Sequence, residues 1–238
     1  MHSTYILVIG STACLGRALA LSILDLPSKP TVIVCGRRKE RLDELIGAHG
    51  AQKIPLDVVM FMNGIQHEYD FTHPEKISLD GKHISKVSDR TNGFDVRCID
   101  VATELETNYL SIVNMTHLFL PHLIKVGKIH PSFIYTLTSG LGILPAAWMP
   151  NCCDSEAALH SFSLVLNIQL QDRNVHVVES LPPLVEPELH NHQEQREIVS
   201  KNWMPLDQFT ALTMEAVQIP IGTSVDLYKR LMAATKTK

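Results

Sequence analysis

The sequence lacks any apolar run approaching the about 20 residues that a membrane-spanning helix needs. It also lacks a basic excess, because 21 lysine and arginine residues face 25 aspartate and glutamate residues, for a net charge of -4. These absences argue against a membrane protein and against a nucleic-acid partner. Residues 1–4 lead into the first apolar segment without the pattern of a signal peptide, so we expect a cytoplasmic protein.

Cysteine is scarce, and its five positions are irregularly spaced: Cys14, Cys35, Cys98, Cys152 and Cys153. An odd number in a cytoplasmic chain predicts free thiols. The adjacent Cys152 and Cys153, even with His160, lack the paired spacing of a zinc site, so no metal is expected. The 12 histidines are scattered, and none is assigned a role.

The chain has 238 residues, of which 45% are hydrophobic. That length supports one substantial core and is too short for two ordinary domains. We therefore expect a single domain over residues 1–238.

An apolar, β-branched run at 5–9 is followed by the glycine-containing segment 10–16 and a helical pattern at 17–24. Gly10 permits a sharp turn after a strand, and Gly16 permits close approach of a pyrophosphate to a helix N-terminus. This order predicts a Rossmann-like α/β fold with a doubly wound parallel sheet.

A second apolar run, 31–35, ends in Gly36, Arg37 and Arg38. At this place in a nucleotide-binding unit, guanidinium groups suit a ribose 2′-phosphate, which favours NADP (NADPH) over NAD. The alternative is that charge alternation over 37–45 marks a solvated helix. The position at the strand end favours phosphate binding for Arg37, and the two interpretations are even for Arg38.

The segment after the first strand resembles the TGxxxGxG element of classical short-chain dehydrogenases/reductases, with Ile9 for the threonine and Cys14 for the middle glycine. The resemblance spans residues 4–190 and looks closest to an uncharacterised fungal branch. Four further elements follow in the family's order: Met62-Asn63-Gly64, Glu106-Thr107-Asn108-Tyr109, Thr138-Ser139-Gly140 and Leu181-Pro182-Pro183-Leu184-Val185.

The resemblance implies a site for a nicotinamide dinucleotide and a small carbonyl or alcohol substrate. The implied cofactor-binding residues are Gly10, Ser11, Thr12, Leu15, Gly16, Arg37, Arg38, Asn63, Gly64, Asn108 and Val185. Ser139 takes the position of the family's catalytic serine, and Asn108 that of its structural and catalytic asparagine. Ser139 as a simple turn residue is equally compatible with the sequence.

In this family a tyrosine transfers the proton, and a lysine four residues later holds the nicotinamide ribose and lowers the tyrosine pKa. Counting from Ser139 places Cys152 and Glu156 there. Cysteine is shorter than tyrosine, and glutamate brings negative charge where the mechanism needs positive charge. We therefore expect a catalytically impaired protein that retains NADP. The alternative is an active NADP-dependent oxidoreductase of fungal secondary metabolism that uses Ser139 and another donor.

Two segments depart from the family in length. The stretch between Cys35 and Asn63 is too short for the usual third strand and its flanking helices, which predicts a shortened sheet edge. There, Asp57-Val58 is interpreted as the family's Asp-Val element joined directly to the next strand. Conversely, 79–101 shows no regular apolar period and is predicted to be an inserted surface loop.

Helical segments 103–126 and 155–170 carry apolar residues on more than one face, which predicts a partner surface. By resemblance they form a homodimer interface; the alternative is that both pack wholly against the sheet of a monomer. The C-terminal portion, 186–238, is expected to hold a polar substrate-covering segment. Beyond it, 214–232 is expected to be a strand-containing tail ending in an amphipathic helix.

Overall fold

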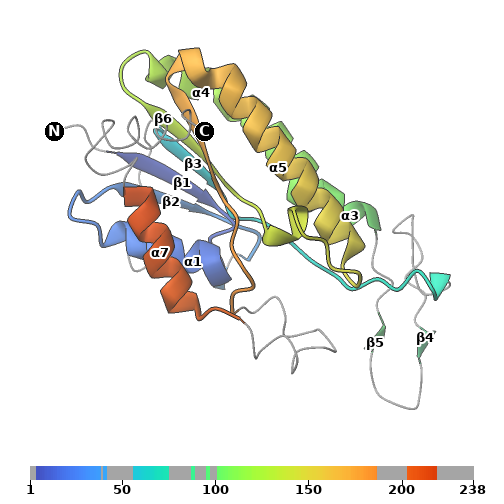
Figure 1. The fold of residues 1–238 in the computed structure, drawn as a ribbon. Helices are drawn as coiled ribbons and strands as arrows, with labels where there is room; N and C mark the ends of the chain where they lie inside the picture. Colours follow the sequence, from blue (N-terminus) through green and yellow to red (C-terminus); the bar gives the residue numbers. More distant parts are fainter. Residues whose placement is uncertain are drawn as a thin grey trace.

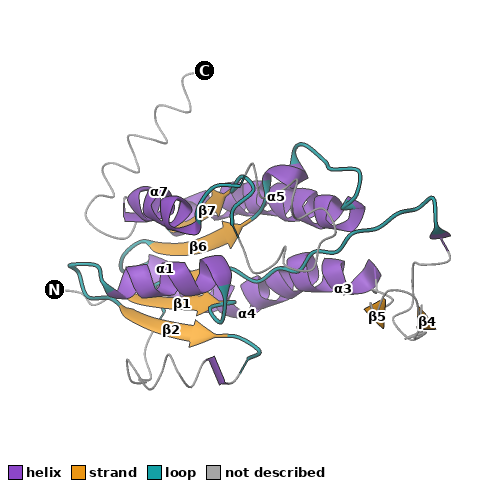
Figure 2. Ribbon diagram, turned by 90° about the horizontal axis from the view of Figure 1, so that it is seen from below, coloured by secondary structure: helices purple, strands orange, loops and turns teal. Residues whose placement is uncertain are grey.

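The core of the fold is a five-stranded sheet whose strands all run parallel, in the order β2-β1-β3-β6-β7. The arrows of β1, β2 and β6 point the same way in Figure 2. The strands are β1 (Tyr5–Ile9), β2 (Thr31–Cys35), β3 (Val58–Phe61), β6 (Ser132–Leu137) and β7 (Val175–Ser180). This computed structural model describes residues 4–38, 40–41, 56–74, 87–88, 95–96, 101–186 and 203–218.

Helices cover both faces of the sheet, as Figure 1 shows. On one face, α1 (Cys14–Leu24) and α7 (Leu206–Gln218) pack on alternate strand residues such as Ile6 and Val8. On the other, α4 (Ser111–Gly127) and α5 (Pro150–Leu170) pack on the intervening residues. Because successive side chains of a strand point to opposite faces, one apolar run supplies both cores. The predicted Rossmann-like fold is therefore confirmed.

The chain order reverses between β1 and β3, because β2 lies on one side of β1 and β3 on the other. In open α/β sheets the crevice outside the carboxyl ends of the strands at such a switch point binds the ligand. Gly10 follows β1 and Asn63 closely follows β3. The fold therefore gathers the predicted cofactor residues at this edge.

Asp57 lies at the opposite edge, where the strands begin. Its Oδ2 accepts a hydrogen bond of 2.7 Å from the Tyr5 backbone N–H, and Oδ1 lies 3.4 Å from His130 Nε2. Val58 is the first residue of β3, so Asp57-Val58 is continuous with this strand, and its interpretation as the family's Asp-Val element joined to the strand stays a prediction. The remaining part of the predicted shortening, 42–55, lies outside the described residues.

The segment 79–101 is not wholly irregular. Its described part includes β4 (Val87–Ser88), which pairs antiparallel with β5 (Asp95–Val96). Apolar alternation is too weak to detect in strands of two residues, so the sequence did not indicate this pairing, and the inserted surface loop stays a prediction.

The helix predicted at 103–126 is confirmed as a continuous run of α3 (Val101–Leu105), the π-helical turn η2 (Glu106–Leu110) and α4. The second, α5, begins at Pro150, earlier than predicted, since proline is favoured in a first helical turn.

The end of the described chain is helical. Met214 lies in α7, so the strand-containing tail predicted from that residue onward begins instead as helix. The proposed substrate-covering segment falls largely on 187–202, and the rest of the tail on 219–238; both lie outside the described residues. No helix within the described ranges has the length and apolarity to span a membrane.

Candidate functional site

The glycine turn after β1 is hydrogen-bonded to the end of β2 and lies close to Met62, the residue after β3. Gly10 has φ +90, and the backbone N–H groups of Gly10 and Ser11 both donate to Cys35 O, at 2.8 and 3.1 Å. A Cβ on Gly10 would lie 2.7 Å from the Met62 carbonyl carbon, and one on Gly16 would lie 2.4 Å from Gly10 O. Both positions therefore require glycine, as expected for a close backbone turn.

The start of α1 suits a pyrophosphate. No side chain caps the helix at Ala13, and no acidic residue lies in its first turn. The helix dipole and the N–H groups of the first turn therefore meet a phosphate without a competing carboxylate. Cys14 adopts φ +43 at the position of the family's middle glycine. Leu15 is half-buried and packs against the core beneath the turn.

Cationic side chains lie beside this turn. Arg38 Nε donates to Thr12 Oγ1 at 3.3 Å, and Arg41 Nη1 donates to Thr12 O at 3.0 Å. Arg37 is exposed after β2. Arg41 is absent from the residues predicted to bind cofactor, although it follows Arg37 by one helical turn in the same charged run. These arginines place positive charge beside the glycine turn.

Hydrogen bonds of the Asn63 and Asn108 side chains connect the segment after β3 to η2 and α4. Asn63 Nδ2 donates to Thr107 O at 2.9 Å and to Ser111 Oγ at 3.2 Å. A Cβ on Gly64 would lie 3.7 Å from Asn108 Oδ1, an ordinary contact. Gly64 is therefore not required there by space.

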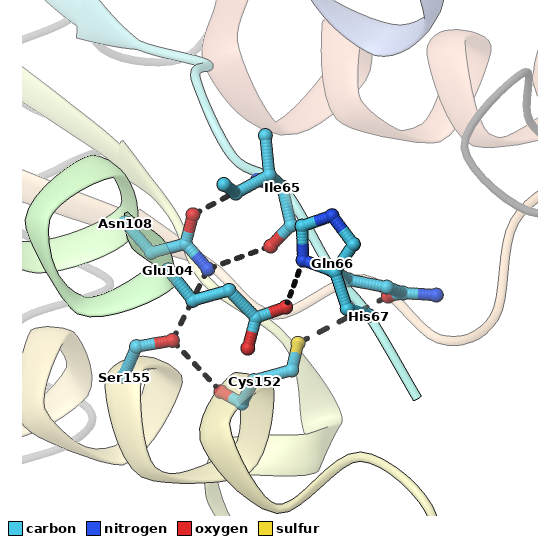
Figure 3. A network of polar contacts seen from close by, with 7 residues as sticks. All are labelled: Ile65, Gln66, His67, Glu104, Asn108, Cys152 and Ser155. Atoms are coloured by element: carbon cyan, nitrogen blue, oxygen red, sulfur yellow. Dashed lines mark hydrogen bonds and ion pairs between the residues drawn. The ribbon is translucent and has the colours of Figure 1, made fainter. Parts of the chain in front are cut away.

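Asn108 is 2% exposed and lies in the π-helical turn η2. Its Oδ1 accepts from Ile65 N at 2.9 Å, and its Nδ2 donates to Ile65 O at 2.9 Å and to Ser155 Oγ at 3.1 Å (Figure 3). These contacts give the Asn108 side chain a positioning role across three segments.

Ser139 follows β6 and begins the short 3₁₀ helix η3 (Gly140–Gly142). Its Oγ accepts a hydrogen bond of 3.2 Å from the Leu141 backbone N–H. The geometry therefore includes the turn-forming role considered from the sequence. It also leaves Ser139 at the carboxyl edge of the sheet, where the predicted substrate would lie.

Cys152 is 4% exposed, and its Sγ lies 3.9 Å from Gln66 Oε1 (Figure 3). Burial raises the pKa of this thiol well above its ordinary range, and the charges of Glu156, Glu104 and Cys153 add to the effect. The group therefore remains a protonated thiol at neutral pH. A thiol so strongly held as S–H is a poor acid and a poor nucleophile.

Glu156 lies one helical turn after Cys152 on α5, close under η3. A Cβ on Gly142 would lie 2.9 Å from the Glu156 carbonyl carbon. Burial, together with the nearby charges of Glu179 and Glu104, raises the pKa of Glu156 to about 8. Its Oε2 is buried without a hydrogen-bond partner. At neutral pH this position therefore holds a largely protonated carboxyl.

Two further glutamates, neither predicted from the sequence, complete the site. Glu104 on α3 is fully buried, with Oε1 3.0 Å from His67 Nδ1 and with Oε2 unpartnered. Figure 3 shows the Glu104 carboxyl between His67 and Cys152. The sequence did carry a signal for Glu104, because this residue precedes the predicted site residue Asn108 by one helical turn.

Glu179, near the end of β7, is the other unpredicted acid. Its Oε2 lies 2.8 Å from His160 Nδ1, and its Oε1 accepts from Thr138 Oγ1 at 2.8 Å. Val185, further along, is buried and bridges to Met204. Across the described ranges no group of three histidine, cysteine, aspartate or glutamate side chains has the arrangement of a metal site.

Comparisons with known proteins agree with this geometry. The family model described as short chain dehydrogenase matches residues 91–198. An uncharacterized oxidoreductase, DltE, from Bacillus subtilis is 30% identical over 230 residues, covering 92% of this chain and 86% of that protein. Sulfoacetaldehyde reductase 2 from Chromohalobacter salexigens is 28% identical over 193 residues, covering 78% and 74%.

Solved structures share the fold at low identity. A short-chain dehydrogenase from Streptomyces avermitilis has a TM-score of 0.68 and 17% identity, covering 94% of this chain and 86% of that one. A short chain dehydrogenase from Burkholderia cenocepacia in complex with NADP has a TM-score of 0.59 and 13% identity, covering 100% and 94%.

Proposed function

Because the chain belongs to the short-chain dehydrogenase family, we propose that it binds NADP at the carboxyl edge of its sheet without catalysing ordinary hydride transfer. The observation that carries this proposal is the buried carboxyl of Glu156, at the position corresponding to the family's lysine. A lysine ammonium there would hold the nicotinamide ribose and stabilise a tyrosine oxyanion. A carboxyl beside Glu179 and Glu104 opposes such an anion.

The residue at the tyrosine position supports the same proposal. The Cys152 thiol is buried against Gln66, and its raised pKa keeps the proton on sulfur. Its side chain is also shorter than a tyrosine, so it reaches less far toward a substrate near Ser139. In the proposed function, Cys152 and Glu156 therefore do not transfer the proton as the family's tyrosine and lysine do.

Cofactor binding depends on other groups. The Gly10 turn, the uncapped start of α1 and the arginines beside Thr12 provide a backbone cradle and positive charge. The Burkholderia cenocepacia relative was solved in complex with NADP. These features support NADP, through its 2′-phosphate, over NAD.

The alternative function is an active NADP-dependent reductase of a small carbonyl or alcohol metabolite. One observation favours it: Glu156 retains its proton at neutral pH, as a general acid must. The Chromohalobacter salexigens relative is named a reductase of sulfoacetaldehyde. The fungal branch stays a prediction, since the relatives above come from bacteria.

We further propose that the protein is a cytoplasmic homodimer whose chain forms a single domain over 1–238. The dimer is supported by apolar side chains on α4 and α5 that are exposed in the monomer, including Leu118 at 74%, Leu164 at 52% and Ile168 at 65%. Exposed apolar surface of this kind is typical of association faces. Sedimentation of the purified protein tests it.

The first experiment is calorimetric titration with NADPH, with NADH as the control. Selective NADPH binding supports the proposed site, whereas the absence of binding to the folded protein would contradict the proposed function. The second experiment is the double variant Cys152→Tyr with Glu156→Lys, assayed with a panel of small aldehydes and ketones. Activity in the double variant but not in the natural chain supports the loss of the proton relay; activity of the natural chain favours the alternative.

A further inference from the structure

Glu156 lies within electrostatic reach of two other glutamates, each on a different element. Glu104 comes from α3, Glu156 from α5 and Glu179 from β7. The charges of Glu104 and Glu179 both act on Glu156. One buried oxygen of Glu104 and one of Glu156 have no hydrogen-bond partner. The site therefore has an excess of acceptors and of potential negative charge.

Within the described part of the chain, two histidines meet these carboxyl groups. His67 contacts Glu104, and His160 contacts Glu179 at 2.8 Å. Each histidine pairs with one glutamate, which leaves Glu156 without a cationic partner among the interactions described here. A lysine at position 156 would instead make this region positive. The replacement therefore removes a positive charge and puts in its place a carboxyl that becomes negative as the pH rises through about 8.

The two redox forms of the cofactor differ in charge at the group this region would meet. The nicotinamide ring is a cation in NADP+ and neutral in NADPH. By the family resemblance, residue 156 lies beside the ribose that carries this ring. A negative potential stabilises the cationic ring, and the effect is larger in a partly buried site than in water. Both forms share the same adenosine and phosphate contacts, so these contacts do not discriminate between them.

We infer that this site binds NADP+ more tightly than NADPH, so that the chain responds to the oxidation state of the cofactor pool. The inference rests on the proposed NADP binding and adds to it a preference between redox forms. It requires no chemical step, because occupancy alone carries the signal. The preference comes from three glutamates that act together, with Glu156 at the position of the family's lysine.

The preference should rise with pH. Glu156 faces Glu179 on β7, Glu104 on α3, and Cys152 and His160 on its own helix, while His67 holds Glu104 from the segment after β3. The pKa of Glu156 is raised to about 8, so its negative charge develops between neutral and alkaline pH. Binding of a cationic ring favours the ionised form and should release a proton.

The test is calorimetric titration of the full chain with NADP+ and with NADPH, at pH 7 and pH 9. We expect a preference for NADP+ of about tenfold at pH 9, equivalent to about 1.4 kcal/mol, and a smaller preference at pH 7. Glu156→Gln should lose most of the increase with pH, and Glu156→Lys should shift the preference toward NADPH. At pH 7, titrations in two buffers of different ionisation enthalpy should detect the proton released with NADP+.

Asp154→Asn is the matched control, because it removes an exposed carboxylate from the same helix. It should leave the ratio of affinities unchanged, and circular dichroism should show that every variant folds. Equal affinity for the two redox forms at both pH values would overturn the inference and leave NADP binding intact. Equal responses of Glu156→Gln and Asp154→Asn would also overturn it. Binding of neither form would overturn the proposed function, and this inference with it.

Discussion

Replacing Asn108 by alanine should lower the free energy of unfolding by more than most single substitutions do. The Asn108 side chain joins η2 to the segment after β3 and to α5 through three hydrogen bonds, two with the Ile65 backbone and one with Ser155 Oγ. It is 2% exposed, so water cannot replace these bonds without rearrangement. The variant leaves the N–H and C=O of Ile65 without these partners.

The magnitude follows from those three bonds. Each contributes about 0.5–1.5 kcal/mol net to folding, so their loss should lower the free energy of unfolding by about 2–4 kcal/mol. In a domain of this size, each kcal/mol shifts Tm by about 2–4 °C. The expected decrease in Tm is therefore about 5–15 °C.

Urea unfolding monitored by circular dichroism measures the change. Asn114→Ala is the matched control, because Asn114 is exposed on the adjoining helix α4. Its loss should alter the free energy of unfolding by less than about 0.5 kcal/mol. An Asn108→Ala variant within about 1 kcal/mol of the natural chain would refute the reasoning, since the hydrogen bonds would then contribute little to folding.

Three other outcomes are expected. Gly16→Ala places a Cβ 2.4 Å from Gly10 O and should abolish NADPH binding in calorimetry; unchanged affinity would contradict a closed turn. Arg41→Ala should weaken binding of NADPH more than that of NADH, because its guanidinium lies at Thr12, beside the predicted phosphate site; an equal loss for both would count against a 2′-phosphate role. Because the pKa of Glu156 is raised to about 8, its contribution to stability is complete at low pH and is lost as the pH rises through that value. Urea unfolding at pH 5 and pH 9 should therefore show a smaller loss of stability for Glu156→Gln than for the natural chain, and an identical loss would argue against a buried carboxyl.

The parallel strands could be predicted because each is a short apolar run that supplies both layers of the core. In β1, Ile6 and Val8 face one pair of helices while Leu7 and Ile9 face the other. Burial on both faces requires continuous apolar character, which is visible in one sequence. The two-residue strands β4 and β5 carry no such signal. Helix α7 was missed because the segment from Met214 onward was interpreted as a strand-containing tail.

The contacts of Glu104 and Glu179 with histidines could not be predicted, and the reason differs from that for β4, β5 and α7. Glu104 meets His67, and Glu179 meets His160, across 37 and 19 positions of sequence. Their proximity is set by the order of strands and helices rather than by any local spacing. Asp57 shows the same limit, because only the register of β1 and β3 reveals that it lies at the amino edge of the sheet.

The two halves of the proposed site differ in how much they depend on side chains. The pyrophosphate end is built from the Gly10 turn and the start of α1, so backbone geometry alone maintains it. In the proposed function, the nicotinamide end depends instead on the side chains at 152 and 156, so two substitutions would be enough to change its chemistry. In the proposed site, loss of the lysine alone would remove a positive charge, whereas Glu156, beside Glu104 and Glu179, adds a negative charge as the pH rises through about 8. A pyrophosphate site retained beside these carboxyl groups would therefore suit the proposed discrimination between two charge states of one cofactor better than hydride transfer.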